Sequence, residues 1–493
     1  MSHLLKTKKN SIKFLRIFFY AFISISVFTI IYFYKGNKIN MVIFAILFNC
    51  IFYFVFSRKA YFFEMFFGGL LWLGFYYKLF LGVIFDNYIF REGAGLYGKI
   101  DFNAKIEILN NTLIIASYGV TGFLLACLIK KHFLYKFFNL RKNLTRTDHV
   151  LNIKLLLFFL LIFFISFFTI TISNFYLGIY QRGIISTFNV HFTVSAIYKW
   201  LLLFGFSSFI AFCFIFTLKS KPQIYAISTI SIIETFFSNL AFLSRGMIFN
   251  CFAIFIGLYK SNRFYKLKLN IKFFLIYLFC ILSVFYLSVI SVNYLRANIF
   301  FVKKDPLKSI IIESEVEVRD EKIKKKYDKF DTSLKEFFEL SRTRWVGIDA
   351  LLAVEASDEK NYNFFKNSFF DKFDKDKYPY YERNIQKRVK KLNNTIQYGI
   401  TTPGIFAFLY YTGSQIFVFF IIFSITLFIL TIEKFIFSIF NNLILCSILS
   451  QVFAYRLIHF GYMPQNTYFL LTSILITIIG LFLLKKLLVI NKK

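Results

Sequence analysis

The stretch LLLFFLLIFFISFFTITI, residues 155–172, decides the fold class of this chain. It contains no charged residue and only scattered Ser and Thr among Leu, Ile and Phe. A helix of about 20 apolar residues is long enough to cross the hydrocarbon core of a membrane. Comparable runs recur along most of the chain, which has 493 residues, 58% of them hydrophobic, and 74 phenylalanines. This pattern predicts membrane-spanning helices and excludes a single soluble domain.

The apolar runs predict an all-α polytopic membrane protein with about 12 transmembrane helices. The expected spans lie near residues 14–34, 41–56, 62–85, 109–129, 155–172, 197–218, 223–242, 247–259, 273–294, 403–432, 435–455 and 467–484. A spanning segment must satisfy its own backbone hydrogen bonds in lipid, so each run is expected to be helical. We therefore expect three parts: residues 1–294 with helices 1–9, residues 295–402 as one large, mainly helical loop, and residues 403–493 with helices 10–12.

Lys and Arg are concentrated in alternate connectors between these spans, as the positive-inside rule describes. The connectors rich in them, and so assigned to the cytoplasm, are 1–13, 57–61, 130–154, 219–222, 260–272, 433–434 and 485–493. The short outer connectors hold Lys35, Lys38, Arg91, Lys99, Lys105, Arg182, Arg245 and Arg456. Both termini are then cytoplasmic, and the large loop lies on the outer, periplasmic side. No small-residue cleavage site follows Tyr34, so the first run is expected to remain as a helix.

Several chemistries lack their sequence signatures. The six cysteines all fall inside apolar runs without CxxC or His–Cys spacing, so neither a disulfide nor a metal site is predicted. No P-loop, GxGxxG, HExxH or Ser-His-Asp pattern is present, and we expect no cofactor. The net charge of +33 lies largely in the connectors, where it orients the chain and contacts phospholipid headgroups. Nucleic acid is therefore not an expected partner.

The outer arginines are the first candidates for chemistry. A guanidinium binds phosphate with two parallel hydrogen bonds and stays charged, so arginine suits an anionic lipid pyrophosphate. Outer arginines occur at Arg182, Arg245, Arg296, Arg342, Arg344, Arg383, Arg388 and Arg456. A solvated or headgroup-bound side chain is the alternative for each of them. Arg245 is singled out because its turn, in LSRGMIF (residues 243–249), is short and leaves the side chain little freedom.

Ionisable residues inside the spans are the second group of candidates. Glu234, in SIIETFFSNL, lies deep in the seventh span, where an ionisable group is costly and is usually functional or paired. Ser238 and Arg245 follow it on the same helical stripe. A hydrogen bond to a neighbouring helix is the structural alternative. Lys78 and Lys199 lie nearer the ends of their spans and are expected to extend toward the headgroups.

The loop contains a segment rich in arginine, SRTRWVGIDALLAV, residues 341–354. Its apolar residues recur at helical spacing, which predicts an amphipathic helix on the membrane surface or against the helix bundle. Arg342 and Arg344 are two positions apart, so they point in different directions. Asp349 is the carboxylate of this segment.

Two further segments follow the loop. In YGITTPGIFAFLYYTGSQ, residues 398–415, Tyr410 and Tyr411 are candidates for contacts with sugars, and a helix start with packing glycines is the alternative. In YRLIHFGYMPQN, Arg456 and His459 lie just beyond the eleventh span. An isolated pair of this kind is a weak signal.

Together these features resemble the bacterial O-antigen polymerases, also called oligosaccharide repeat-unit polymerases. The resemblance covers about a dozen helices, two cytoplasmic termini and one large outer loop late in the chain. Its local matches are SRGMIF at residues 244–249, SRTRWVGIDAL at 341–351 and TTPGIFAFLYYTGS at 401–414.

The resemblance implies a glycosyltransferase that moves a growing glycan from undecaprenyl pyrophosphate to the next lipid-linked repeat unit, at the outer face of the bacterial inner membrane. On this hypothesis Arg245 and one of Arg342 or Arg344 bind pyrophosphate. Asp349 or Glu234 orients or deprotonates the acceptor hydroxyl. Substrate contacts are expected from Arg182, Arg296, Tyr410, Tyr411, Arg456 and His459. A flippase and a chain-length regulator are the implied protein partners.

Other functions stay open. An O-antigen ligase uses a similar donor and layout, and its lipid A-core acceptor would distinguish it. A lipid-linked oligosaccharide flippase is a second alternative, although transporters place polar groups near the bilayer midplane and often show paired halves. Here charge inside the spans is sparse, and the polar residues are concentrated in one late loop. A non-enzymatic scaffold or receptor is the third alternative.

Overall fold

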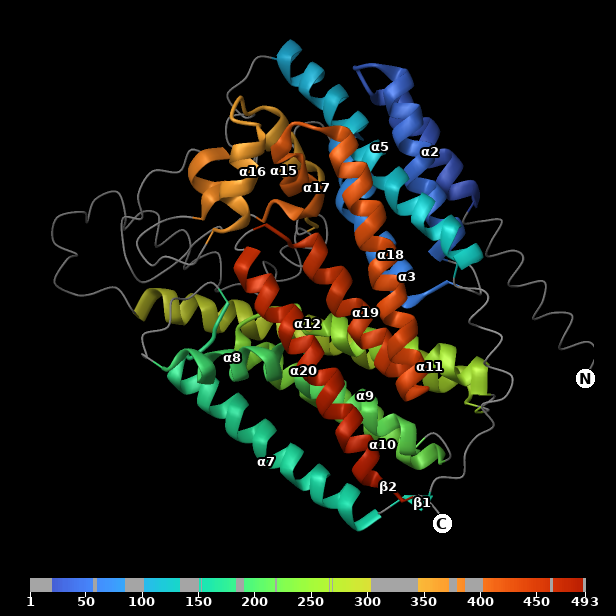
Figure 1. The fold of residues 1–493 in the computed structure, drawn as a ribbon, viewed down its shortest axis with the longest axis vertical. Helices are drawn as coiled ribbons and strands as arrows, with labels where there is room; N and C mark the ends of the chain where they lie inside the picture. Colours follow the sequence, from blue (N-terminus) through green and yellow to red (C-terminus); the bar gives the residue numbers. More distant parts are fainter. Residues whose placement is uncertain are drawn as a thin grey trace, which may run out of the picture.

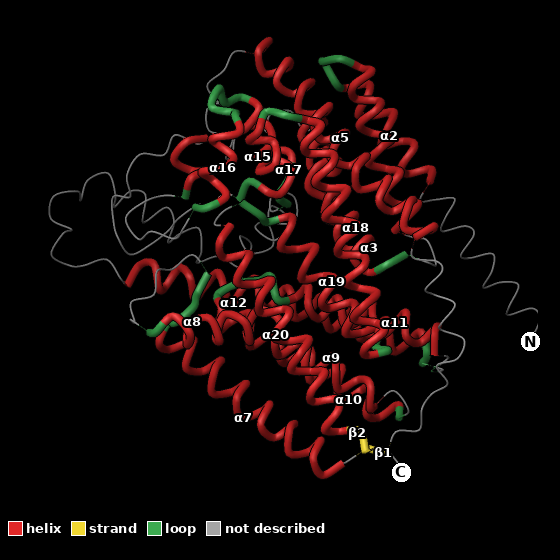
Figure 2. Tube along the Cα trace, viewed as in Figure 1, coloured by secondary structure: helices red, strands yellow, loops and turns green. Residues whose placement is uncertain are grey.

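The computed structural model describes residues 20–55, 60–84, 102–133, 150–151, 153–182, 190–217, 220–265, 267, 269–302, 345–371, 379–385, 402–461 and 464–490. Within these ranges nearly all residues are helical, as Figure 2 shows. One pair of two-residue strands, β1 (Val150–Leu151) and β2 (Val489–Ile490), joins the chain near the start of α7 to its carboxyl-terminal end.

The helices follow one another along the chain as Figure 1 labels them. Before the loop they are α2 (Lys38–Val55), α3 (Phe62–Leu71), η1 (Trp72–Tyr77), α4 (Lys78–Ile84), α5 (Phe102–Phe133), α7 (Ile153–Leu177), α8 (Phe192–Trp200), η4 (Leu201–Gly205), α9 (Phe206–Thr217), α10 (Lys221–Phe242), α11 (Ile248–Tyr265) and α12 (Ile271–Val302). In the loop and after it they are α15 (Ile348–Glu355), α16 (Tyr362–Phe369), η6 (Tyr381–Ile385), α17 (Gly404–Leu409), η7 (Tyr410–Thr412), α18 (Gln415–Phe440), α19 (Leu443–Ile458) and α20 (Pro464–Leu488).

Nine helical stretches of the described residues are long and apolar enough to cross a membrane. They are Lys38–Val55, Phe62–Ile84, Lys105–Lys130, Lys154–Leu177, Phe192–Phe214, Lys221–Phe242, Ile271–Arg296, Gln415–Phe440 and Thr467–Leu488. The three other predicted spans correspond to α11 and to two shorter apolar helices, Tyr20–Phe33 and Leu443–Ile458. The described residues are therefore those of a helical membrane-embedded protein, and the count of twelve spans stays a prediction.

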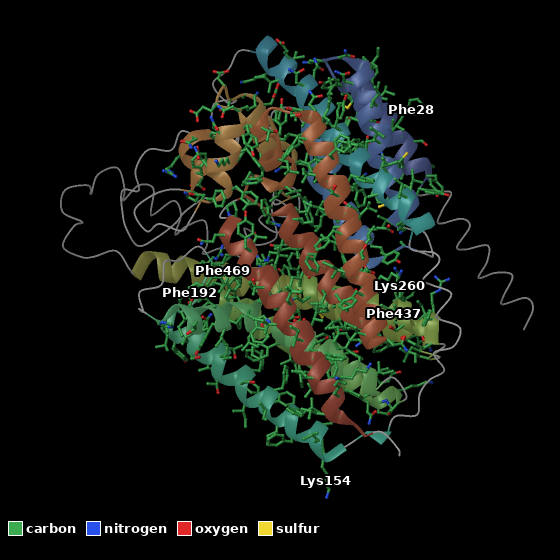
Figure 3. All side chains as sticks on the ribbon, in the orientation of Figure 1. Phe28, Lys154, Phe192, Lys260, Phe437 and Phe469 are labelled. Atoms are coloured by element: carbon green, nitrogen blue, oxygen red, sulfur yellow. The ribbon has the colours of Figure 1, made fainter. Side chains whose placement is uncertain are left out.

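Two groups of helices pack on either side of α19 (Figure 1). Helices α2, α3, α5 and α18 form one group, and α7, α9, α10, α11 and α12 form the other. Glycine allows close approaches between these helices: a Cβ on Gly257 of α11 would lie 2.7 Å from the Cα of Ile444 in α19, and one on Gly122 of α5 would lie 2.5 Å from the carbonyl oxygen of Phe419 in α18. Small residues at helix contacts have this effect in membranes, because packing replaces the hydrophobic effect as the force between helices. At one edge of the second group, the ring of Phe192 in α8 contacts that of Phe469 in α20, 5.2 Å between centroids (Figure 3).

Contacts between connectors sort them into two sets at opposite ends of the spans. At one end, three side chains each donate a hydrogen bond of 2.7 Å to a backbone carbonyl oxygen of another connector region. The donor–acceptor pairs are Lys260–Ala60, Tyr265–Asn441 and Lys485–Ile439. At the other end the pairs are Tyr34–Asn110, Arg182–Phe242 and Gly404–Phe460. These are the two sets that the Lys and Arg pattern predicts. Which end faces the cytoplasm stays a prediction, so we call the second set the outer end.

Three predicted boundaries are corrected. Residues 433–434 are not a connector, because α18 continues to Phe440 and the chain turns at Asn441, whose φ is 51°. The predicted tenth span, 403–432, is long enough to be tilted or broken; it is broken into α17, η7 and α18 at Gly413, which has a φ of 76°, and its last helix extends to Phe440. Helix α12 runs past residue 294 to Val302. Polar or charged residues occur at each position, namely Glu433 and Lys434, Thr412 to Gln415, and Arg296. Hydropathy alone does not show whether the helix ends, breaks or continues there.

Candidate functional site

Arg182 occupies the centre of a cluster at the outer end of the helices. Its Nη1 donates to the hydroxyl of Tyr455 at 3.1 Å and lies 3.4 Å from Oγ of Ser244. These residues come from three connections: the one after α7, the turn between α10 and α11, and the end of α19. Contact with Tyr455 raises the pKa of Arg182 above its usual value. Neither Arg182 nor Arg456 forms an ion pair with another described residue.

Asn174 places the Arg182 connection against α10. Its Nδ2 donates to the carbonyl oxygens of Tyr180 at 3.0 Å and Ala241 at 2.6 Å, and its Oδ1 accepts from the Tyr180 amide at 2.8 Å. The connection leaves α7 through Gly178, whose φ of 61° suits glycine. A side-chain amide can satisfy backbone donors and acceptors at once, so one buried Asn fixes the whole turn.

Arg245 and Arg296 lie beside this cluster. The turn that carries Arg245 begins at Leu243, which is left-handed with a φ of 48°. A Cβ on the next residue, Gly246, would lie 3.2 Å from the Tyr455 hydroxyl, so the turn runs directly over the cluster. Nη2 of Arg296 donates to the carbonyl oxygen of Arg182 at 3.0 Å. Arg182, Arg296 and Arg456, from three regions of the sequence, thus converge, and the turn that carries Arg245 lies beside them.

His459 and Arg456 complete the cluster. The His459 ring stacks on Tyr455 with centroids 4.1 Å apart, and its Nδ1 lies 2.9 Å from the Tyr455 carbonyl oxygen. Burial and then the charge of Arg182 lower the pKa of His459 to about 3. Arg456 is close enough to Arg182 for their charges to repel. The imidazole is therefore neutral at physiological pH, and donation from Nδ1 to the carbonyl leaves Nε2 as a proton acceptor.

One wall of the cluster is aromatic. The ring of Phe249 contacts Tyr455 at 5.5 Å between centroids and Trp345 at 6.5 Å. Trp345 opens the described part of the loop, so this contact connects the loop to the arginines. The sequence singles out neither Tyr455 nor Phe249, because aromatic residues are common throughout this chain.

Asp349 is held by a lysine. Its carboxylate pairs with Nζ of Lys78, and the two side chains are 18% and 13% exposed. An ion pair with a lysine makes this carboxylate a poorer proton acceptor. The expectation that Lys78 extends toward the headgroups is wrong, because its ammonium binds the loop.

Glu234 is buried inside the bundle and accepts hydrogen bonds from hydroxyl groups. Oε2 accepts from Ser207 of α9 at 2.9 Å, and Oε1 accepts from Ser238 of α10 at 2.9 Å. Ser207 in turn accepts from the side chain of Asn250 in α11 at 3.3 Å. Glu234 therefore forms the hydrogen bond to a neighbouring helix that is the alternative to a functional role. We therefore do not keep it as a catalytic candidate.

Tyr410 and Tyr411 are buried, so their rings are not open to a sugar in this structure, and their contact with substrate stays a prediction. Tyr411 is 0% exposed and its ring contacts Phe364 at 5.0 Å. The Tyr410 hydroxyl donates to Glu355 at 2.8 Å, and Glu355 also accepts from Asn111 of α5 at 3.2 Å. Both tyrosines thus join the loop to the bundle. Arg342 and Arg344 lie outside the described residues.

A second charged cluster, at the end opposite the arginines, has no counterpart among the predicted residues. Glu64 of α3 pairs with Lys130 of α5, and the Glu64 side chain is fully buried. Glu433 of α18 accepts from the amides at the start of α3, and Lys260 donates to the carbonyl oxygen of Ala60. Charged residues inside FFEMFFGG and TIEKFIF are the sequence signal that could have identified it. Here carboxylates and lysines balance, so this cluster is structural.

No group of three metal-ligating side chains occurs among the described residues. Comparison of the chain with protein-family models, with curated proteins and with solved structures finds no match. The candidate site therefore consists of the arginine cluster: Arg182, Arg245, Arg296, Arg456, Tyr455 and His459.

Proposed function

We propose that this chain is a polysaccharide polymerase of the O-antigen type, a glycosyltransferase that joins undecaprenyl-pyrophosphate-linked repeat units at the periplasmic face of the bacterial inner membrane. The observation that carries the proposal is the arginine cluster. Arg182 and Arg456 lie close together at the end of the spans and have no carboxylate partner among the described residues. Two such guanidinium groups favour a bound anion, and the pyrophosphate of a lipid carrier has the charge and the oxygen geometry that they bind.

The proposed reaction is displacement at the anomeric carbon of the donor glycan. The acceptor hydroxyl oxygen forms the new bond to that carbon, and the bond to the pyrophosphate oxygen breaks with its electron pair. Arginines of the cluster stabilise the negative charge that gathers on the departing lipid pyrophosphate, and because the donor already carries this leaving group no nucleotide hydrolysis is needed. His459, which is neutral and close to the arginines, accepts a hydrogen bond from the acceptor hydroxyl at Nε2 and orients it, and the proton leaves to water as the new bond forms.

This assignment differs from the carboxylate base expected from the sequence. Asp349 is paired with Lys78, and Glu234 is occupied by serine hydroxyls within the bundle. His459, predicted only as a substrate contact, is neutral, and with Nδ1 donating to the Tyr455 carbonyl oxygen its Nε2 can accept a hydrogen bond from the acceptor hydroxyl. A ligase would use the same donor chemistry, so only the acceptor separates it from a polymerase.

The test is polymer formation by the purified chain in liposomes, supplied with undecaprenyl-pyrophosphate-linked repeat units and with lipid A-core as a competing acceptor. We expect a ladder of products from the parent, whereas Arg182→Ala should leave the single-repeat substrate unpolymerised. Arg263→Ala is the matched control, because Arg263 is an exposed arginine at the opposite end of α11. A full ladder from Arg182→Ala, or transfer to lipid A-core in place of the repeat unit, would contradict the polymerase proposal.

A further inference from the structure

The loop enters the bundle through a contact between two backbones. A Cβ on Gly347 would lie 2.3 Å from the carbonyl oxygen of Gly74, and a Cβ on Gly74 would lie 2.1 Å from that of Val346. Gly74 belongs to the π-helical turn η1, and such turns often occur where a helix meets a functional element. No side chain fits between the two chains here, so glycine is required on both sides.

Residues 345–355, which we call the docked segment, are packed inside the protein. Ile348, Leu351, Leu352 and Val354 are each 0% exposed. The helix of this segment, α15, lies against α5 and α17. Such burial places irregular backbone within the helix bundle, where protein surrounds it and lipid does not.

Lys78, which begins α4 directly after η1, contacts the docked segment twice. Its Nζ donates to the carbonyl oxygen of Trp345 at 3.1 Å and pairs with the carboxylate of Asp349. These two acceptors flank the entry to α15, and Asp349 is in its first turn, where a negative charge also favours the helix. One ammonium therefore fixes both the start and the orientation of the segment.

The opposite side of Trp345 faces the arginine cluster. Trp345 contacts Phe249, Phe249 contacts Tyr455, and Tyr455 accepts the hydrogen bond of Arg182. A shift of Trp345 would therefore remove one wall of the cluster. The geometry connects Lys78 to Arg182 through three aromatic side chains.

We infer that Lys78 is a positioning residue: it docks residues 345–355 on the bundle and so holds the aromatic wall of the arginine cluster, and Asp349 is the carboxylate that receives it. The docking is independent of the proposed function, whereas its effect on glycan transfer rests on that function. Removing one member of a largely buried ion pair is strongly destabilising, which favours undocking of the segment.

Docking is tested by the reactivity of a cysteine introduced at Leu351, measured on purified protein in detergent. The rate of maleimide addition is followed by mass spectrometry of the peptide that contains position 351, which separates it from the native cysteines. Asp358→Cys, at an exposed position, is the control for reagent access. We expect Leu351→Cys to react slowly in the parent and about tenfold faster, or more, in Lys78→Met, with Asp358→Cys unchanged. Tenfold corresponds to about 1.4 kcal/mol.

Lys78→Arg, which keeps the charge, should retain the slow reaction. The exchange Lys78→Asp with Asp349→Lys should restore it in part, because the pair is re-formed with its polarity reversed. Equal reactivity of Leu351→Cys in the parent and in Lys78→Met would overturn the inference.

Polymer formation separates positioning from proton transfer. If Asp349 serves only to receive Lys78, the exchange variant regains polymer that Lys78→Met loses. A docked exchange variant that makes no polymer, beside a parent that does, would overturn the positioning role in favour of a reacting carboxylate. A parent without polymer would contradict the proposed function, while the reactivity measurement would still decide the docking.

Discussion

Replacing Glu433 by glutamine should destabilise the protein far from the arginine cluster. The carboxylate of Glu433 accepts hydrogen bonds from the amides of Phe62 and Phe63 and from the hydroxyl of Ser450, each 2.9 Å long. These amides begin α3, where no backbone acceptor is available and the helix dipole favours negative charge. A residue of α18 therefore caps a helix that lies some 370 positions earlier in the chain.

The magnitude follows from what glutamine can keep. The side-chain carbonyl oxygen of glutamine can accept a hydrogen bond from one of the two backbone amides. Its NH₂ group would face the second amide, and two donors cannot form a hydrogen bond. One hydrogen bond to a charged group, about 1.5–3 kcal/mol, is lost, together with about 0.5–1 kcal/mol from the dipole. We expect Glu433→Gln to lower the free energy of unfolding by about 2–4 kcal/mol.

The assay is reversible unfolding in mixed micelles with increasing dodecyl sulfate, followed by tryptophan fluorescence. Ser438→Ala is the matched control on the same helix, because the Ser438 hydroxyl is exposed and donates only to the carbonyl oxygen of Phe435. Ser438→Ala should change the free energy of unfolding by no more than about 0.5 kcal/mol. Equal midpoints for Glu433→Gln and Ser438→Ala would refute the capping role of this carboxylate.

Three further predictions concern the outer end. Gly347→Ala should undock the loop, because its Cβ would lie 2.3 Å from the Gly74 carbonyl oxygen, and maleimide reactivity at position 351 should report this as a rise; unchanged reactivity would contradict it. Tyr455→Phe should reduce polymer formation about tenfold, because it removes the hydroxyl that accepts from Arg182, and it should change the free energy of unfolding by no more than about 1 kcal/mol. The folded-state pKa of His459 lies near 3, below the usual 6.5, so the imidazole remains neutral as pH falls. Polymer formation should therefore stay level between about pH 7 and pH 5. A loss of polymer formation centred near the usual histidine pKa of about 6.5 would refute a neutral His459.

The helical architecture is accessible from sequence because it depends on the length of apolar runs and the position of Lys and Arg. The strand pair at residues 150–151 and 489–490 joins two connectors that this pattern assigns to one side. The break at Gly413 and the continuation of α18 through Glu433 are not accessible in the same way. Hydropathy averages over such positions, whereas the structure decides them through a left-handed glycine and a buried capping carboxylate.

The candidate site, too, could be predicted from the sequence only in part. Arg182, Arg245 and Arg456 come from short connectors, and alternation along the chain places all short outer connectors at one end, so their convergence follows from topology. Tyr455 and Lys78 do not follow, because their importance lies in contacts with segments distant in sequence. The same limit explains Tyr411, whose composition suggests sugar binding but whose ring is enclosed by the loop.

The two charged clusters differ in a way that bears on function. At the end with Glu64 and Glu433, carboxylates and lysines from different helices balance, and the hydrogen bonds of both carboxylates remain inside the protein. At the outer end, Arg182 donates to neutral hydroxyls and lies beside Arg456 without a described carboxylate partner. Bringing like charges together costs free energy that packing alone does not recover. A chain that could place a glutamate there, as it does at the opposite end, instead leaves the positive charge available, and this difference is what we expect of a site that binds an anion.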